Sequence, residues 1–434
     1  MRKNRNTALF VCFLAALSMS ASAEESYEAP PAFKAKDILP AELLSSEHHR
    51  VLETVQNDGY LNHYLIQSDY GDFDAHGRTM LRIRVREVAA LAELDKVSKT
   101  GVFLKAAADA GIEDIKVITH LATHPLETVK GIPSGIAGLF RKVGNVMTDV
   151  ADAGTELATG ATDGNAVDAA AEAGELVGDV AGLPAVERRW AQKLRVDPYT
   201  SNETLSAAIS EVAKVELAAS TGAGFAVPSV PGMTYISGVN DVVWKKGPSE
   251  LREENRLALL AMGATEDGAA AFLDSEHFST SLRSVMVAAL NRMDGVEGRE
   301  ILVGQALGAS SEIDAWFFGV STILVSWFHE NEAPVDRLVG GINMPVMRTM
   351  DGRMVSILPV EHLSWTETIE AAAGRFTALA DAQGIGGGRE LWFGGTASDR
   401  CVEELSARGW TVRQNIRDRV DLPVNFSGTT GESK

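Results

Sequence analysis

The spacing of apolar residues predicts β-structure near the start of the chain. Residues 48–56 and 60–68 are rich in β-forming side chains and flank Asn57, Asp58 and Gly59. An Asp-Gly pair between two such runs is a strong hairpin signal. A short run at 70–74 extends the hairpin, so the pattern predicts a small β-meander.

Helical spacing begins at Arg78. Leu81, Val85 and Val88 recur on one side of a helix, which predicts a helix over 78–94 and a second over 102–110. The same criterion predicts helices over 185–194, 202–219, 248–262, 266–273, 279–293 and 298–307. Residues 315–328 are apolar on all sides but too short a run to cross a bilayer, so they predict a buried core helix.

Strands return in the C-terminal part. The turn Asp351-Gly352 separates runs at 345–350 and 353–358 and predicts a second hairpin. The remaining pattern predicts a helix over 364–383, then a parallel strand, helix and strand over 389–393, 399–407 and 410–414. We therefore expect an α+β protein: an N-terminal β-meander with helices, a helical middle region, and a C-terminal β-hairpin plus β-α-β element.

Composition changes along the chain and suggests its divisions. Residues 24–47 are rich in Pro and Glu, and residues 145–183 combine Ala, Gly and acidic residues without Lys or Arg, as flexible linkers do. The expected divisions are a signal peptide at 1–23, a loose lead-in at 24–47, an N-terminal β-hairpin and helical domain at 48–144, an acidic linker at 145–183, a helical domain at 184–343, a C-terminal α/β element at 344–420 and a tail at 421–434.

The first residues have the pattern of a cleavable secretory signal. Basic residues within 1–5 precede an uncharged, mostly apolar run at 8–17, and Ala21-Ser22-Ala23 matches a small-residue cleavage site. We expect cleavage after Ala23 and a periplasmic or secreted protein whose mature chain has no transmembrane span. An uncleaved anchor is the alternative reading.

Charge and cysteine content narrow the function further. The formal net charge is −19, which disfavours nucleic acid as a partner because phosphate binding needs clustered Lys and Arg. Removal of the signal peptide would remove Cys12 and leave Cys401 alone. The mature chain would then form no intramolecular disulfide and hold no metal through several cysteines.

Common catalytic motifs are absent from the sequence. It has no G-x-S-x-G, Walker A or EF-hand pattern. His329-Glu330 begins an H-E-x-x-H motif, but Ala333 takes the place of the second histidine. We therefore expect no zinc-protease site and no cofactor.

Histidines and aspartates also cluster without an obvious metal geometry. A two-residue turn at Asp58-Gly59 would put Thr54 opposite His63 and place His48 about 20 Å away. His49 belongs to the same group of histidines. The aspartates at 69, 72 and 74 fit a turn, with a calcium site as the alternative. The pair His120 and His124 lacks further ligands. The sequence predicts no metal site.

The loop after the strand at 389–393 is the first candidate binding site. It opens a helix at the carboxyl end of a strand, where α/β folds bind ligands, and its N–H groups suit an anion. A capped turn without a ligand, and a buried Cys401, are the alternatives. The candidate ligand-binding residues are Gly394, Gly395, Thr396, Ser398, Arg400 and Cys401, with Asp399 beside them and Trp365, Trp392 and Trp410 as walls of a pocket.

The stretch at 119–144 is the second candidate. Its apolar stripe with flanking basic residues fits a segment lying on a membrane surface; a helix pair packed on the N-terminal domain is the alternative, because Gly and Pro weaken helices. The candidate membrane-contact residues are Lys130, Ile132, Ile136, Leu139, Phe140, Arg141 and Lys142.

Four phrases carry a resemblance: LDKVSKTGVF, THPLETVKGIPSGI, RRWAQKLRVDPYTSN and LPVEHLSWTE. They resemble exported proteobacterial proteins of uncharacterised function, a resemblance that implies export from the cytoplasm and no particular activity.

Two hypotheses about function follow from the sequence. The first is a non-catalytic envelope protein that binds a partner protein, a membrane surface or a small ligand. The second is a periplasmic enzyme of an unfamiliar family with its site at 394–401. The oligomeric state is left open.

Overall fold

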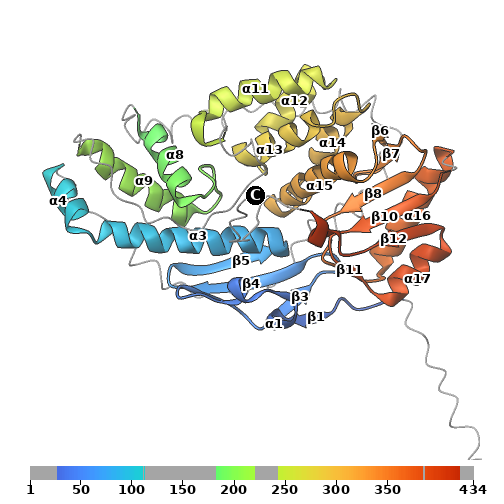
Figure 1. The fold of residues 1–434 in the computed structure, drawn as a ribbon, viewed down its shortest axis with the longest axis horizontal. Helices are drawn as coiled ribbons and strands as arrows, with labels where there is room; N and C mark the ends of the chain where they lie inside the picture. The colour runs from blue at the N-terminus through green and yellow to red at the C-terminus, as the bar shows by residue number, and fades with distance from the viewer. Residues whose placement is uncertain (1–26, 111, 113–181, 220–242, 385–386, 421–434) are drawn as a thin grey trace, which may run out of the picture.

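The computed structural model describes residues 27–110, 112, 182–219, 243–384 and 387–420 (Figure 1). The signal peptide, the stretch at 119–144 with all its candidate membrane contacts, His120 and His124, nearly all of the predicted linker and the tail lie outside these residues. The described residues form an N-terminal sheet with helices, a helical middle region and C-terminal strands. The predicted α+β class is confirmed.

Antiparallel strands build the N-terminal sheet. They are β1 (Ala32–Lys34), β2 (His49–Val51), β3 (Thr54–Asn57), β4 (Asn62–Ser68) and β5 (Gly71–His76), with β3 and β5 each paired to β4. The predicted hairpin and its third strand are confirmed, but His63 pairs with Gln56 and not with Thr54. The connection at 58–61 is longer than expected because the Asp58 carboxylate accepts the N–H groups of Tyr60 and Leu61.

The segment expected as a loose lead-in is ordered from residue 27 onward. It contains β1, α1 (Ala35–Ile38) and α2 (Ala41–Leu44), and β1 pairs with β3. Ala35, Leu39 and Leu43 are buried in a core with Tyr64 and Ile66. The expectation was wrong there because these spaced apolar residues, although few, all face the sheet core.

A long helix, α3 (Gly77–Ser98), spans two hydrophobic cores. Its first half packs with the N-terminal sheet, and its second half packs with α4 (Gly101–Asp109), α8 (Leu183–Leu194) and α9 (Glu203–Ala218). Figure 1 shows α3 running along the sheet toward this helical group. Trp190 is fully buried in the second core, which makes α8 and α9 packing partners of α3.

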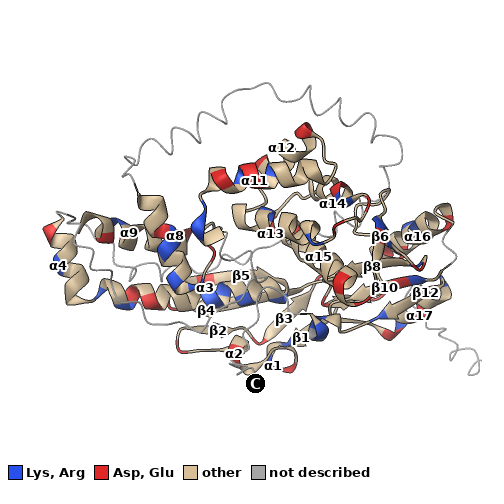
Figure 2. Ribbon diagram, turned by 45° about the horizontal axis from the view of Figure 1, so that its top comes forward, with Lys and Arg blue, Asp and Glu red and all other residues tan. Residues whose placement is uncertain are grey.

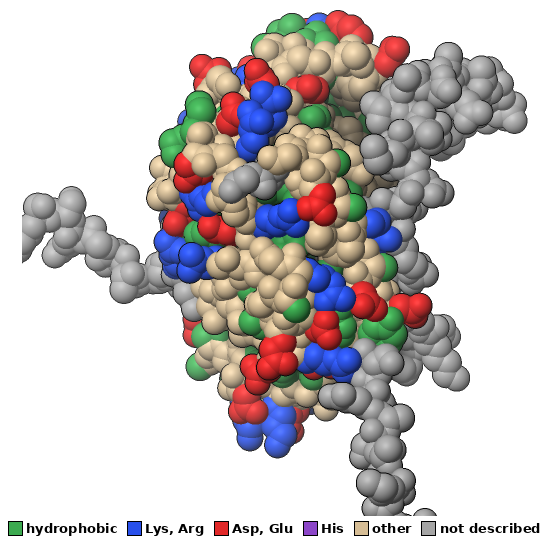
Figure 3. All heavy atoms as spheres, turned by 90° about the vertical axis from the view of Figure 1, so that its right-hand side faces the viewer, with side chains coloured by type: hydrophobic (Ala, Val, Ile, Leu, Met, Phe, Trp, Pro, Cys, Tyr) green, Lys and Arg blue, Asp and Glu red, His purple; other side chains and the backbone are tan. Residues whose placement is uncertain are grey.

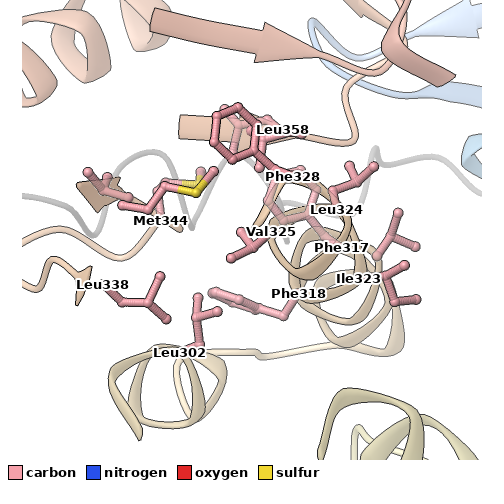
Figure 4. Packing of buried hydrophobic residues seen from close by; sticks show 14 of the residues in the cluster. Leu302, Phe317, Phe318, Ile323, Leu324, Val325, Phe328, Leu338, Met344 and Leu358 are labelled. Atoms are coloured by element: carbon pink, nitrogen blue, oxygen red, sulfur yellow. The ribbon is translucent and has the colours of Figure 1, made fainter. Parts of the chain in front are cut away.

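The third core joins the remaining helices to the C-terminal sheet. The helices are α11 (Pro248–Ala261), α12 (Glu266–Asp274), α13 (Thr280–Asn291), α14 (Arg299–Ala306) and α15 (Glu312–Asn331). α15 contains the run predicted as a buried core helix, and this prediction is confirmed. In Figure 4, Phe318 and Phe328 of α15 lie near Leu302, Met344 and Leu358, so side chains from helix and sheet fill one core.

Parallel and antiparallel strands share the C-terminal sheet. Its order is β12 (Trp410–Arg413), β10 (Arg389–Phe393), β8 (Met354–Leu358), β7 (Met347–Thr349) and β6 (Val335–Leu338). β8, β10 and β12 are parallel and are connected through α16 (Glu367–Ala382) and α17 (Asp399–Ala407). The predicted hairpin and parallel β-α-β unit are confirmed, and a further β-α-β unit and β6 are added. β9 (His362–Leu363) and β11 (Thr396–Ala397) pair in parallel where β8 and β10 end.

The surface carries mixed charge. Acidic and basic residues follow one another along α3 and α11 (Figure 2), and they are interspersed on the face formed by the C-terminal element (Figure 3). None of the helices in the described ranges is both long and apolar enough to cross a membrane.

Candidate functional site

A shallow pocket lies where three parts of the chain meet; its cavity volume is about 30 Å³, and about 500 Å³ when the open space at its mouth is included. The start of α3 forms one side, α15 forms the second, and the segments that follow β8 and β10 form the third. The carboxyl ends of parallel strands are where α/β sheets bind ligands. The lining residues are Leu61, His76, Gly77, Arg78, Thr79, Met80, Ile313, Trp316, Phe317, Val320, Leu324, Pro359, Glu361, Gly394 and Arg417.

The pocket has an apolar wall and a polar wall. α15 contributes Trp316, Phe317 and Val320 to the lining of the pocket; Phe317 and Val320 also belong to the core, and half-buried Trp316 packs against it. The opposite wall contains Arg78 and Arg417. Such a combination holds the apolar body of a small molecule and orients its polar end.

Glu361 organises the polar wall. Its side chain is only 2% exposed and forms an ion pair with Arg417 at 3.0 Å. One carboxylate oxygen also accepts the N–H of Arg78 at 2.6 Å; the other accepts the N–H of Asn62 at 3.2 Å and the hydroxyl of Tyr64 at 3.1 Å. Glu361 therefore ties the end of β8 to β4, to α3 and to the residues after β12. These bonds occupy both oxygens of its carboxylate.

Positive charge accumulates beside this carboxylate. Burial, with Arg78 and Arg417 nearby, lowers the pKa of Arg82 to about 10. The Nε–H of Arg78 is buried and has no acceptor among the described residues, while its Nη2 donates to the carbonyl of Ile38. Burial and the charge of Glu361 raise the pKa of Tyr64, which keeps the hydroxyl protonated as a donor. An anion in the pocket would reduce the repulsion among the arginines.

The loop predicted as an anion site borders this pocket but turns its N–H groups elsewhere. The N–H groups of Gly394 and Gly395 donate to the carbonyls of Leu358 and Val360, and that of Thr396 donates to Glu361, at 2.7–3.0 Å. A Cβ on Gly395 would lie 2.0 Å from the Glu361 carbonyl oxygen, so only glycine fits. Of the predicted ligand-binding residues, Gly394 alone lines the pocket.

The other predicted residues of this loop have structural partners. The Ser398 hydroxyl accepts the N–H of Cys401 at 3.0 Å, which caps α17, and donates to Glu28. Cys401 is fully buried, and burial, with Glu28 and Glu404 nearby, raises its thiol pKa to about 12. Arg400 lies half-buried on α17 beside exposed Asp399. The geometry matches the capped turn with a buried cysteine, which was the alternative to a ligand site.

The tryptophans expected to form walls of a pocket are packed elsewhere. Trp392 meets Phe328 and Trp410 meets Phe376, both edge-on, while the Arg408 guanidinium lies 4.7 Å from the ring centre of Trp365. All of these indoles are buried. The tryptophan that does line the pocket is Trp316, from α15.

A second cluster lies on the N-terminal sheet. His63 and His76 face each other across β4 and β5 with stacked rings whose centres are 4.3 Å apart. Asp74 is hydrogen-bonded to His63 and lies 3.6 Å from Nε2 of His76. Burial acts to raise the pKa of Asp74, but the two histidines outweigh it and hold that pKa well below its usual range.

Sequence reasoning missed this cluster although a signal existed. Ser68 pairs with Gly71 across a two-residue turn, and counting back from that turn places His63 opposite His76. From the sequence alone, His63 was compared with His48, and His76 was overlooked. His48 instead bonds Asp69 at 2.9 Å near the other end of β4, as the predicted separation from His63 requires.

Comparison with known proteins gives no relative: no family model, no curated protein and no solved structure matches this chain.

Proposed function

We propose that this is an exported, non-catalytic protein that binds a small organic anion in the pocket between α3, α15 and the C-terminal sheet. The observation that carries the proposal is the pairing of arginines on one wall with an apolar helix face on the other. The anionic group would lie toward Arg78 and Arg417, and the apolar body would lie against Trp316 and Phe317.

The charge of the lining supports an anionic ligand. Arg78 and Arg417 line the pocket against the single carboxylate of Glu361, and Arg82 adds positive charge nearby. This excess stands out in a chain whose net charge is −19. A ligand carboxylate bound there would gain charge-assisted hydrogen bonds from partly buried guanidinium groups.

Binding without catalysis is supported by the groups near the pocket. Glu361 already accepts hydrogen bonds at both oxygens, Cys401 is buried with a raised thiol pKa, and the N–H groups of the 394–396 loop pair with backbone carbonyls. A nucleophile or oxyanion-stabilising group needs to be available to substrate. These groups are engaged, so the enzyme hypothesis loses the site on which it rested.

The exported location is proposed from the sequence. The basic start, apolar run and Ala21-Ser22-Ala23 cleavage pattern suit a periplasmic or secreted protein. Whether residues 130–142 also contact a membrane is a separate prediction, tested by vesicle co-sedimentation with and without 119–144.

Calorimetric titration of the purified protein tests the proposal. The probes are benzoate, hexanoate and succinate, with benzamide and hexanamide as neutral analogues. We expect binding of an acid with an apolar body, weaker binding at high salt, and no binding of its amide. Binding of none of the acids, or equal binding of acid and amide, would contradict the proposal.

Two variants of α15 locate the binding. Trp316→Ala removes part of the apolar wall and is expected to weaken binding by at least about tenfold, or 1.4 kcal/mol. Trp327→Ala is the matched control, because Trp327 is also half-buried on α15 but does not line the pocket. Equal losses in both variants would place the ligand elsewhere.

A further inference from the structure

We propose that His63, Asp74 and His76 bind a divalent transition-metal ion of the Zn²⁺ class on the N-terminal sheet. This inference is independent of the organic-anion proposal. It replaces the sequence-based expectation that the chain has no metal site. Within the described residues these three form a group whose donor atoms all lie within 4.8 Å of one another.

The β-ladder sets the positions of the three side chains. His63 and His76 are directly paired residues of β4 and β5, and Asp74 precedes His76 by two residues on β5. Because side chains alternate between the two faces of a strand, all three lie on the same face. Tyr64 and Ala75 belong to the opposite face, in the core. The ligands are therefore held by a hydrogen-bonded ladder and not by a loop.

A buried nitrogen of the cluster has no hydrogen-bond partner among the described residues. Nε2 of His76 is buried, and its nearest carboxylate oxygen, on Asp74, is 3.6 Å away, beyond hydrogen-bonding distance. A buried polar atom without a partner is costly unless an ion or water completes it. A metal ion between His76, His63 and Asp74 would coordinate this nitrogen directly.

The donor set selects the class of metal. Imidazole nitrogens suit Zn²⁺, Ni²⁺, Cu²⁺ and Fe²⁺, whereas Ca²⁺ and Mg²⁺ prefer sites made of oxygen ligands. Two histidines and one carboxylate leave at least one coordination position for water or another ligand. The side chains of His63 and Asp74 are 29% and 36% exposed, which gives an ion access from solvent.

The same contacts also fit a metal-free cluster in which protonated histidines pair with Asp74. The two interpretations differ in their response to metal. Metal binding releases protons and requires neutral imidazoles, so affinity would fall as pH drops through the histidine pKa range. A purely structural cluster would not respond to Zn²⁺ at neutral pH.

The test is Zn²⁺ titration of the metal-stripped, purified protein in competition with a chromogenic chelator, in the absence of any organic acid. We expect one Zn²⁺ bound per chain and a higher unfolding temperature with Zn²⁺. His63→Gln and His76→Gln are each expected to weaken binding by about 100-fold or more, because loss of a residue that only hydrogen-bonds a metal ligand already costs about 10–100-fold.

His48→Gln is the matched control, because His48 also bonds an aspartate, Asp69, but belongs to no group of three donor residues within 4.8 Å of one another in the described ranges. Its Zn²⁺ affinity should equal that of the unaltered protein. The proposal is overturned if the unaltered protein binds no Zn²⁺, or if His63→Gln binds it as tightly as His48→Gln does. Should His76→Gln fail to fold, the His63→Gln comparison decides alone.

Discussion

Removing the charge of Glu361 should destabilise the protein more than removing any exposed carboxylate. In Glu361→Gln the side chain keeps its shape, but one oxygen becomes an NH2 group. Four donors converge on the carboxylate, from Asn62, Tyr64, Arg78 and Arg417. The glutamine side chain can accept hydrogen bonds only at its carbonyl oxygen. Two of the four donors would therefore lose their acceptor and lie against the new NH2 group.

The cost follows from burial. The Glu361 side chain is 2% exposed and that of Arg417 13%, so solvent screens the pair little. Breaking a buried ion pair by neutralising one partner costs about 3–5 kcal/mol. The loss of two hydrogen bonds to a charged group, at about 1.5–3 kcal/mol each, gives a similar figure. Free energies of unfolding are commonly about 5–15 kcal/mol, so this loss would remove a large share of the stability of the protein.

Urea unfolding followed by tryptophan fluorescence at pH 7 measures this difference. Glu370→Gln is the control, because Glu370 also pairs with an arginine, Arg408, but is 43% exposed. An exposed pair contributes about 0–1 kcal/mol. If Glu361→Gln lost no more stability than Glu370→Gln, the role assigned to Glu361 in joining three parts of the chain would be refuted.

Three further predictions concern other positions. Gly395→Ala should destabilise the protein, because the added Cβ would overlap the Glu361 carbonyl. Gly374→Ala on α16 has open space around the added Cβ and should be neutral or stabilising by up to about 1 kcal/mol. Urea unfolding measures the free energy of unfolding of both variants. Cys401 should react with a thiol reagent only after denaturation, since it is buried with a pKa of about 12; rapid labelling of the folded protein would contradict the packing of α17. Burial raises the pKa of Asp197 to about 6, above its value in the unfolded chain. The stability that its protonated form contributes is therefore present below about pH 4 and is lost as pH rises through 6. Asp197→Asn should remove this part of the pH dependence of the unfolding free energy between about pH 4 and 7, and an unchanged pH profile would contradict the prediction.

The helices and strands with strong local signals were predictable from the sequence. The strand at Arg389–Phe393 and the helix at Asp399–Ala407 have the predicted bounds, because Gly and cap residues mark their ends. β6 was missed, since its short run VDRL has no turn signal and forms only by pairing with β7. Its strand character depends on a long-range contact that local patterns do not contain.

The site was less predictable than the fold. The loop at 394–398 was found from its place after a strand, and it does border the pocket, but the N–H groups of residues 394–396 pair with carbonyls 35 to 36 residues earlier in the chain. Glu361 shows no local sign of burial; its partners come from β4, α3 and the residues after β12. Such convergence follows from tertiary packing, which local spacing does not specify.

A crystal structure of the protein grown with 4-bromobenzoate would show whether the pocket between α3, α15 and the C-terminal sheet binds an organic anion. The anomalous signal of bromine locates the ligand without interpretation of its shape. We expect bromine against Trp316 and Phe317, with the carboxylate toward Arg78 and Arg417. Bromine bound only outside this pocket, or an empty pocket in crystals that contain the ligand, would contradict it.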